Sequence, residues 1–198
     1  TTTLLFKDVA GTADAYTINF NADNTAATNA GTVVVDKIET VTVNSVGKTG
    51  VTNTIALTDA DAKSLVITGD KAINVSFVTA FGTDFNATTA PTAGVTTIDA
   101  SALTAGLTIG TLVNVGEAEK GLTIKGGSGD DNITTGAYTK DLTIDAGAGN
   151  DTIDTTGATG KVIVNAGAGN DILTVGAVGG TFTLGAGNDK IDVTLAKG

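Results

Sequence analysis

Short segments in which apolar and polar residues alternate recur along the chain. Successive side chains of a strand point to opposite faces, so this alternation predicts strands with one buried and one solvated face. The clearest segments are LTIK from Leu122, LTID from Leu142, VIVN from Val162 and FTLG from Phe182. A second apolar segment follows each of them, beginning at Ile133, Ile153, Leu173 and Ile191.

Between the two strands of each pair lies a glycine-rich turn, and the four turns align with one another. They are GGSGDD from Gly126, AGAGND from Ala146, AGAGND from Ala166 and LGAGND from Leu184. Their aspartates recur at intervals of 20, 20 and 18 residues. A fixed period of this length indicates a repeat protein in which each repeat is one structural unit.

One repeat therefore consists of a strand, a glycine-rich turn, a second strand and a second turn. Stacked repeats would form two parallel sheets around a thin aliphatic core. We expect an all-β fold, a right-handed parallel β-helix or β-roll solenoid. The second turns read TGAYTKD, TGATGK and GAVGG and lack the glycine–aspartate pattern, so only one edge should bind metal.

The first 120 residues contain similar strands without these turns, for example ETVTVN from Glu39 and SLVITG from Ser64. We expect residues 1–120 to form an irregular region of β-strands or β-helix. A loop insertion is expected near residues 78–94, where Thr, Ala, Asn and Gly accumulate around Pro91, the only proline. Residues 121–198 should form the regular β-roll, and the two regions should be one continuous solenoid.

The composition excludes several classes of function. The chain has no Cys, His, Met, Trp, Arg or Gln, so it has no thiol nucleophile, no Ser-His-Asp triad and no zinc finger. A net charge of −10 argues against nucleic-acid binding, which requires clustered cations. We therefore expect no enzymatic activity and no nucleic-acid partner.

The N-terminus, Thr1-Thr2-Thr3-Leu4, has neither a Met nor a cationic segment followed by a long apolar one. It resembles neither a signal peptide nor a membrane anchor, and no segment approaches the roughly 18 apolar residues of a spanning helix. We expect the chain to be part of a longer protein that does not insert into a membrane.

The acidic residues are 18 Asp and three Glu, an excess typical of turns and of hard-cation sites. Stacked parallel strands are about 4.8 Å apart, so the repeated aspartates would form a column at nearly that spacing. Two unit charges about 5 Å apart repel by about 1 kcal/mol in water and by several kcal/mol at an effective dielectric constant near 20. Such a column needs cations. Ca²⁺ fits better than Mg²⁺, because it accepts six to eight oxygens in flexible geometry.

The turns resemble the calcium-binding nonapeptide GGxGxDxUx of RTX proteins. The resemblance implies calcium ions between successive turns, bound by the sixth-position carboxylates of Asp131, Asp151, Asp171 and Asp189. It also implies ligands from the carbonyl oxygens of Gly127, Ser128, Gly129, Gly147, Ala148, Gly149, Gly167, Ala168, Gly169, Gly185, Ala186 and Gly187. The first position of the turn is glycine only at Gly126 and is Ala146, Ala166 and Leu184 in the other turns. The expected ligands therefore leave out the carbonyl oxygens of this first position.

From about Gly31 to its end, the chain resembles the C-terminal region of RTX-type bacterial surface-layer (S-layer) proteins of the Caulobacter kind. The segments that carry this resemblance are GTVVVDKIETVTV from Gly31, TIALTDADAKSLVITGDKAINVSF from Thr54 and VTTIDASALTAG from Val95. The family implies a secreted structural protein, exported by a type I system, that self-assembles with calcium into a two-dimensional lattice on the bacterial cell surface. Binding to cell-surface polysaccharide would belong to an N-terminal region absent from this chain.

Two other classes remain open. One is a calcium-dependent adhesin or ice-binding module, which would present a flat face of outward threonines. The other is the calcium-dependent folding and secretion module of an RTX exoprotein, with a catalytic domain upstream. Outside the four turns, we expect solvated turn residues at Asp59, Asp61, Asp70, Asp84 and Asp99. For Asp70 and Asp99, which lie at strand ends, a role as a metal ligand at the edge of a coil stays open.

Overall fold

The computed structural model describes residues 2–4, 13–21, 23, 25–35, 38–59, 62–81, 95–112 and 121–194. These residues form seventeen strands and no helix. The strands make two parallel sheets of nine and eight strands, here named sheet A and sheet B. No helix in this part of the chain is long and apolar enough to cross a membrane.

The strands alternate between the two sheets along the chain. Sheet A consists of β1 (Thr2–Leu4), β3 (Asn29–Val35), β5 (Thr52–Asp59), β7 (Ala72–Phe81), β9 (Leu107–Ile109), β11 (Asn132–Thr134), β13 (Thr152–Thr155), β15 (Ile172–Val175) and β17 (Lys190–Val193). Sheet B consists of β2 (Ala15–Asn19), β4 (Thr40–Ser45), β6 (Ser64–Gly69), β8 (Thr97–Leu103), β10 (Leu122–Lys125), β12 (Leu142–Asp145), β14 (Val162–Ala168) and β16 (Gly180–Ala186).

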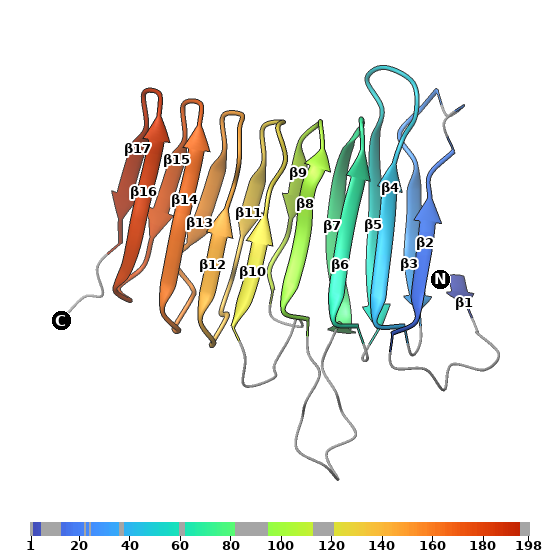
Figure 1. The fold of residues 1–198 in the computed structure, drawn as a ribbon, viewed down its shortest axis with the longest axis horizontal. Coiled ribbons are helices and arrows are strands. Elements are labelled where there is room, and N and C mark those ends of the chain that lie inside the picture. The colour runs from blue at the N-terminus through green and yellow to red at the C-terminus, as the bar shows by residue number, and fades with distance from the viewer. Residues whose placement is uncertain are drawn as a thin grey trace, which may run out of the picture.

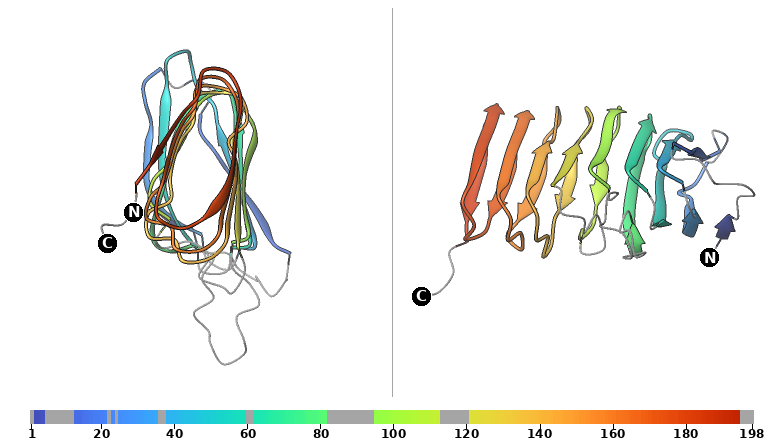
Figure 2. Two further views of the ribbon diagram at one scale, coloured as in Figure 1. Left: turned by 90° about the vertical axis from the view of Figure 1, so that its left-hand side faces the viewer. Right: turned by 60° about the horizontal axis from the view of Figure 1, so that its bottom comes forward.

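Each coil supplies one strand to each sheet, and every coil lies directly on its neighbour (Figure 1). Seen along the stack, the coils surround one narrow interior (Figure 2). The repeat sets the register: Leu122 lies beside Leu142, and Leu142 lies beside Val162. This arrangement confirms the predicted all-β parallel solenoid.

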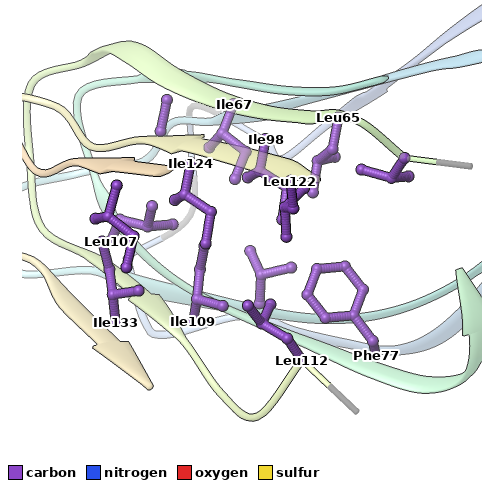
Figure 3. Packing of buried hydrophobic residues seen from close by; sticks show 14 of the residues in the cluster. Leu65, Ile67, Phe77, Ile98, Leu107, Ile109, Leu112, Leu122, Ile124 and Ile133 are labelled. Atoms are coloured by element: carbon purple, nitrogen blue, oxygen red, sulfur yellow. The ribbon is translucent and has the colours of Figure 1, made fainter. Parts of the chain in front are cut away.

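Inward-pointing residues of the two sheets form the core between them. In sheet B one such row is Val41, Leu65, Ile98, Ile124, Ile144 and Val164, and in sheet A one is Ile55, Val75, Ile109, Ile133, Ile153 and Leu173. All of these side chains are buried. Figure 3 shows how residues of the two sheets meet across the interior. Each such side chain contributes about 1.5–3 kcal/mol by its burial, so the stack is stabilised mainly by contacts between neighbouring coils.

The strands before residue 113 belong to the same two sheets but are less regular. The register shifts between Asn29 and Thr32, between Leu57 and Asp59, and between Val66 and Thr68. The insertion expected near residues 78–94 begins later than its composition indicated, because Val78–Phe81 completes β7. Residues 82–94 lie outside the described part of the chain.

The core predicts a clear difference between two isoleucines of neighbouring coils. Ile144 is buried between the sheets, whereas Ile163 points outward from sheet B and is 37% exposed. Because Ile144→Ala leaves a cavity in the core, we expect it to lower the free energy of unfolding by about 2–5 kcal/mol. Ile163→Ala should lower it by about 1 kcal/mol or less. Urea denaturation measures both, and equal losses would contradict the assignment of the inward rows.

Candidate metal centre

The four glycine-rich turns lie above one another along a single edge of the solenoid. They join β10 to β11, β12 to β13, β14 to β15 and β16 to β17, at the upper edge in Figure 1. Because the flanking strands are in register, corresponding turn residues are neighbours: Ala148 pairs with Ala168, and Gly167 pairs with Gly185. The structure therefore places Asp131, Asp151, Asp171 and Asp189 at corresponding positions of four consecutive turns.

The glycines of these turns are required by the approach of one turn to the next. Gly167 has φ +108° and Gly185 has φ +97°, values that other residues rarely adopt. A Cβ atom on Gly167 would clash with the carbonyl oxygen of Gly147, and one on Gly185 would clash with that of Gly167. Close packing of the backbone is thus sufficient to explain the glycine pattern, whether or not a metal binds.

Backbone hydrogen bonds also join neighbouring turns directly. Four of the carbonyls expected to face an ion accept an N–H of an adjacent turn. The bonds run from Ala148 to Gly127 (3.1 Å), from Ala168 to Gly147 (3.0 Å), from Gly149 to Ala168 (2.9 Å) and from Gly169 to Ala186 (2.8 Å). Each of these oxygens keeps one further lone pair, so the backbone donors of a metal site are partly engaged within the protein.

The column of aspartates points into the turns and forms a ladder with the backbone. Asp131, Asp151 and Asp171 are 2%, 0% and 1% exposed. The backbone N–H of Asp131 donates to Oδ1 of Asp151 (2.8 Å), and that of Asp151 donates to Oδ1 of Asp171 (2.8 Å). Asp171 donates in the same way to Asp189 (3.0 Å), which is half-buried. Each carboxylate therefore caps the backbone of the preceding coil.

The second carboxylate oxygens distinguish the members of this column. Oδ2 of Asp131 accepts a hydrogen bond from the N–H of Gly127 (2.9 Å). In contrast, Oδ2 of Asp151 and Oδ2 of Asp171 are buried and have no hydrogen-bond partner. Buried polar atoms are nearly always paired with a protein group, a water or an ion, so these two oxygens are open to a water or a cation.

Electrostatics at Asp151 support the same interpretation. Burial raises the pKa of Asp151 to about 7, and the charges of Asp131, Asp171 and Asp130 act in the same direction. The N–H of Asp131 opposes this shift. Burial likewise raises the pKa of Asp131 above its ordinary value, against the hydrogen bonds from Leu107 and Gly127. A proton or a cation at Asp151 would therefore relieve the cost of its buried charge near neutral pH.

The residue before each aspartate forms a second, outer ladder that the repeat pattern did not predict. Asn150 donates its backbone N–H to Oδ1 of Asp130 (2.7 Å), Asn170 donates to Oδ1 of Asn150 (2.9 Å), and Asn188 donates to Oδ1 of Asn170 (2.8 Å). This ladder runs opposite to the inner one, because here each side chain caps the following coil. The recurring Asn-Asp pair was the available signal, since Asn and Asp side chains commonly bond to nearby backbone groups.

The donors that the site offers are oxygens alone, which is the set preferred by a hard cation such as Ca²⁺. The two free Oδ2 atoms and the turn carbonyls would be the ligands. Among the described residues, no group of three or more His, Cys, Asp or Glu side chains is placed to hold a metal ion. Any metal here would thus depend on backbone carbonyls for most of its coordination.

The aspartates outside the turns have different environments. Asp59 lies in β5 and is 2% exposed, so the expectation of a solvated turn residue was wrong at this position. Asp70 is exposed and pairs with Lys71 (2.5 Å). Asp99 is half-buried, accepts hydrogen bonds from Ser101 and pairs with Lys125 (3.2 Å). Asp61 and Asp84 lie outside the described residues.

No protein-family profile matches the chain, and no curated protein or solved structure shows significant similarity to it.

The raised pKa of Asp151 predicts how stability depends on pH when calcium is removed. Between pH 3.8, the ordinary pKa of this carboxyl, and about pH 7, its pKa in the folded chain, Asp151 holds a proton in the folded chain that it has lost in the unfolded chain. The free energy of unfolding should therefore fall as pH rises through this window, by about 1.4 kcal/mol per unit at most, and then level off.

The contribution of Asp151 is isolated by comparing the parent chain with Asp151→Asn. The Asn side chain keeps an acceptor for the N–H of Asp131 but does not titrate. Urea denaturation in EDTA at several pH values should show a flatter profile for the variant between pH 4 and 7. Parallel profiles would mean that Asp151 titrates normally in the folded chain.

Proposed function

We propose that the chain binds calcium ions between its glycine-rich turns and serves as a self-assembling structural element of a bacterial surface layer. The observation that carries the calcium part is the pair of buried carboxylate oxygens, on Asp151 and Asp171, that have no hydrogen-bond partner. The surface-layer part rests on the resemblance of the strand segments from Gly31 onward. On this proposal the protein is secreted and acts at the cell surface without catalysis.

The residues that would hold calcium follow from the turn geometry. Oδ2 of Asp151 and Oδ2 of Asp171 would supply carboxylate ligands, and carbonyl oxygens of the turns from Ala146 and Ala166 would complete the set. Asp131 would be a weaker metal ligand, because both of its carboxylate oxygens already accept backbone hydrogen bonds. When bound, calcium would neutralise the buried charge of the column and connect successive coils.

Calcium binding of this kind would count directly as folding free energy. The unfolded chain does not hold the four turns in register, so an ion that binds only the folded stack stabilises it by mass action. A stack of coils is stabilised mainly between neighbours, so each bridging ion would strengthen the contact on which the fold depends. Such a calcium requirement is also useful outside the cell, because assembly can then wait until after export.

Calcium should stabilise the parent chain more than the variant Asp151→Asn. At about 100 times the dissociation constant, one site adds about 2.7 kcal/mol to the free energy of unfolding. The variant removes one free Oδ2 while keeping the acceptor for Asp131, so it should gain much less from calcium. In EDTA at pH 8 it should be at least as stable as the parent, because it lacks the buried charge.

Asp145→Asn is the matched control for this experiment. Asp145 lies in the same coil but on the outer face of sheet B, where it is exposed and accepts a hydrogen bond from Asn165 (2.9 Å). It should gain as much from calcium as the parent chain. Thermal unfolding followed by circular dichroism in EDTA and in millimolar Ca²⁺ measures all three proteins. Equal stability of the parent chain in both buffers would disprove calcium binding.

Self-assembly should depend on the same ion. At a net charge of −10, copies of the chain repel one another, and calcium would both reduce this repulsion and order the turns. Negative-stain electron microscopy should show ordered arrays in calcium and none in EDTA. A chain that remains monomeric by light scattering at high protein and calcium concentrations would contradict the surface-layer role.

A further inference from the structure

The position of the inner aspartates continues through the earlier coils, where it holds uncharged residues. Asp131 lies beside Leu107, whose backbone N–H donates to Oδ1 of Asp131 (2.8 Å). Leu107 pairs with Ile73, and Ile73 pairs with Asn53. Leu107, Ile73 and Asn53 are all fully buried. One inward column of sheet A therefore changes from neutral to acidic between β9 and β11.

The neutral members of this column need no cation beside them. Ile73 and Leu107 are apolar and belong to the buried core. Asn53 donates from Nδ2 to Oγ of Ser45 (3.0 Å) and to the carbonyl oxygen of Val46 (3.1 Å). Its Oδ1 is buried without a hydrogen-bond partner, but an amide oxygen has no net charge, so its burial costs much less than that of a carboxylate. At this position, the earlier coils have no buried charges to neutralise.

Two other carboxylates of the earlier coils lie in different surroundings. Asp59 is buried, but it lies at the opposite end of β5 from Asn53, and its partner in β7 is Phe81. Asp70 is exposed in the turn before β7 and pairs with Lys71 (2.5 Å). Neither resembles the inner aspartates, which lie above one another in successive turns and repel one another.

The earlier coils also have longer strands and larger core residues. β5 and β7 contain eight and ten residues, whereas β11 and β13 contain three and four. Phe77, which lies in the interior in Figure 3, packs against Phe81 with the ring centroids 5.1 Å apart, and both are buried. Longer strands add backbone hydrogen bonds and buried apolar area, so these coils should open at a higher free energy than coils with short strands.

The neutral and the acidic coils meet in two continuous sheets. Thr123 of β10 pairs with Thr97 of β8, and Asn132 of β11 pairs with Thr108 of β9 (Figure 1). The first acidic coil therefore lies in register on β8 and β9. If the earlier coils are folded, these two strands offer the acidic coils an ordered edge to pair with.

We propose that the coils formed by β4–β9, here named the template, fold without calcium, and that the coils formed by β10–β17, here named the aspartate coils, fold onto the template when calcium binds. This inference rests on the proposed calcium binding and names the part of the chain that calcium controls. Coils of a solenoid contact only their neighbours, so one part of the stack can be ordered while another is not. Order then spreads from β8 and β9 into the aspartate coils as calcium is added.

Hydrogen exchange of the full chain, followed by mass spectrometry at pH 8, tests this inference. Relative to EDTA, calcium at 100 times its dissociation constant should slow exchange in residues 142–175 about 100-fold, which is the factor that one bound ion adds. Exchange in residues 52–59 and 64–81 should change by less than about threefold, because these residues open independently of the aspartate coils. Loss of protection in both parts together in EDTA would overturn the inference.

Two double variants test whether the buried charges decide which coils need calcium. Asp151→Asn with Asp171→Asn gives the column the amide that Asn53 has at the same position, and it keeps the Oδ1 acceptors of the inner ladder. In EDTA, residues 142–175 of this variant should exchange at least about tenfold more slowly than in the parent chain, because the uncompensated buried charges are gone. Asp145→Asn with Asp154→Asn removes two carboxylates from the outer faces of β12 and β13 and should exchange as the parent does. Equal exchange in the two double variants would overturn the inference.

The outcomes distinguish this inference from the proposed function. If calcium slows exchange equally in the template and in the aspartate coils, calcium binding stands and only the template is wrong. If exchange in residues 142–175 is the same in calcium and in EDTA, calcium does not stabilise these turns and both proposals fail. If β5 and β7 exchange freely in EDTA while residues 142–175 stay protected, the order of folding is reversed and the inference is overturned.

Discussion

Stacking of coils in register is the constraint on which the rest of this structure depends. Neighbouring strands lie about 4.8 Å apart, so in the regular coils from Leu122 onward a strand residue lies beside its equivalent in the next coil. An apolar residue is thereby placed against another apolar residue, as in the row Ile124, Ile144 and Val164. A polar residue is placed against a polar one, as Asp145 is against Asn165. The repeat therefore determines which residues form the core, which form the outer surface and which form the turns.

The same constraint makes a repeated carboxylate a problem that hydrogen bonds solve only in part. At this spacing the inner aspartates repel one another, and burial strengthens the repulsion. Backbone N–H groups of the turns satisfy the Oδ1 atoms, and the opposed ladder of Asp130, Asn150 and Asn170 satisfies further N–H groups on the outside. These two ladders leave Oδ2 of Asp151 and Oδ2 of Asp171 without a hydrogen-bond partner. The proposed cation would therefore neutralise the negative charge at these two oxygens.

Much of the fold follows from the sequence because two simple periods describe it. Alternation with period two assigns inward residues such as Ile144 and Val164, and the interval of about twenty residues assigns their neighbours in the stack. The column of aspartates could be predicted for the same reason. A repeat period does not specify which hydrogen bonds a carbonyl or carboxylate oxygen accepts. The backbone hydrogen bonds between turns and the outer asparagine ladder were therefore not predicted.

Less regular parts of the chain were harder to predict for a related reason. Before residue 113 the register shifts at three places, so a residue's partner cannot be read from a fixed interval. Asp59 follows one such shift and is buried in β5, although its type and its neighbours indicated an exposed turn. Val78–Phe81 has the composition of a loop but completes β7, whose pairing with β5 resumes at Phe81 beside Asp59. Local composition was overruled in both cases by contacts between coils.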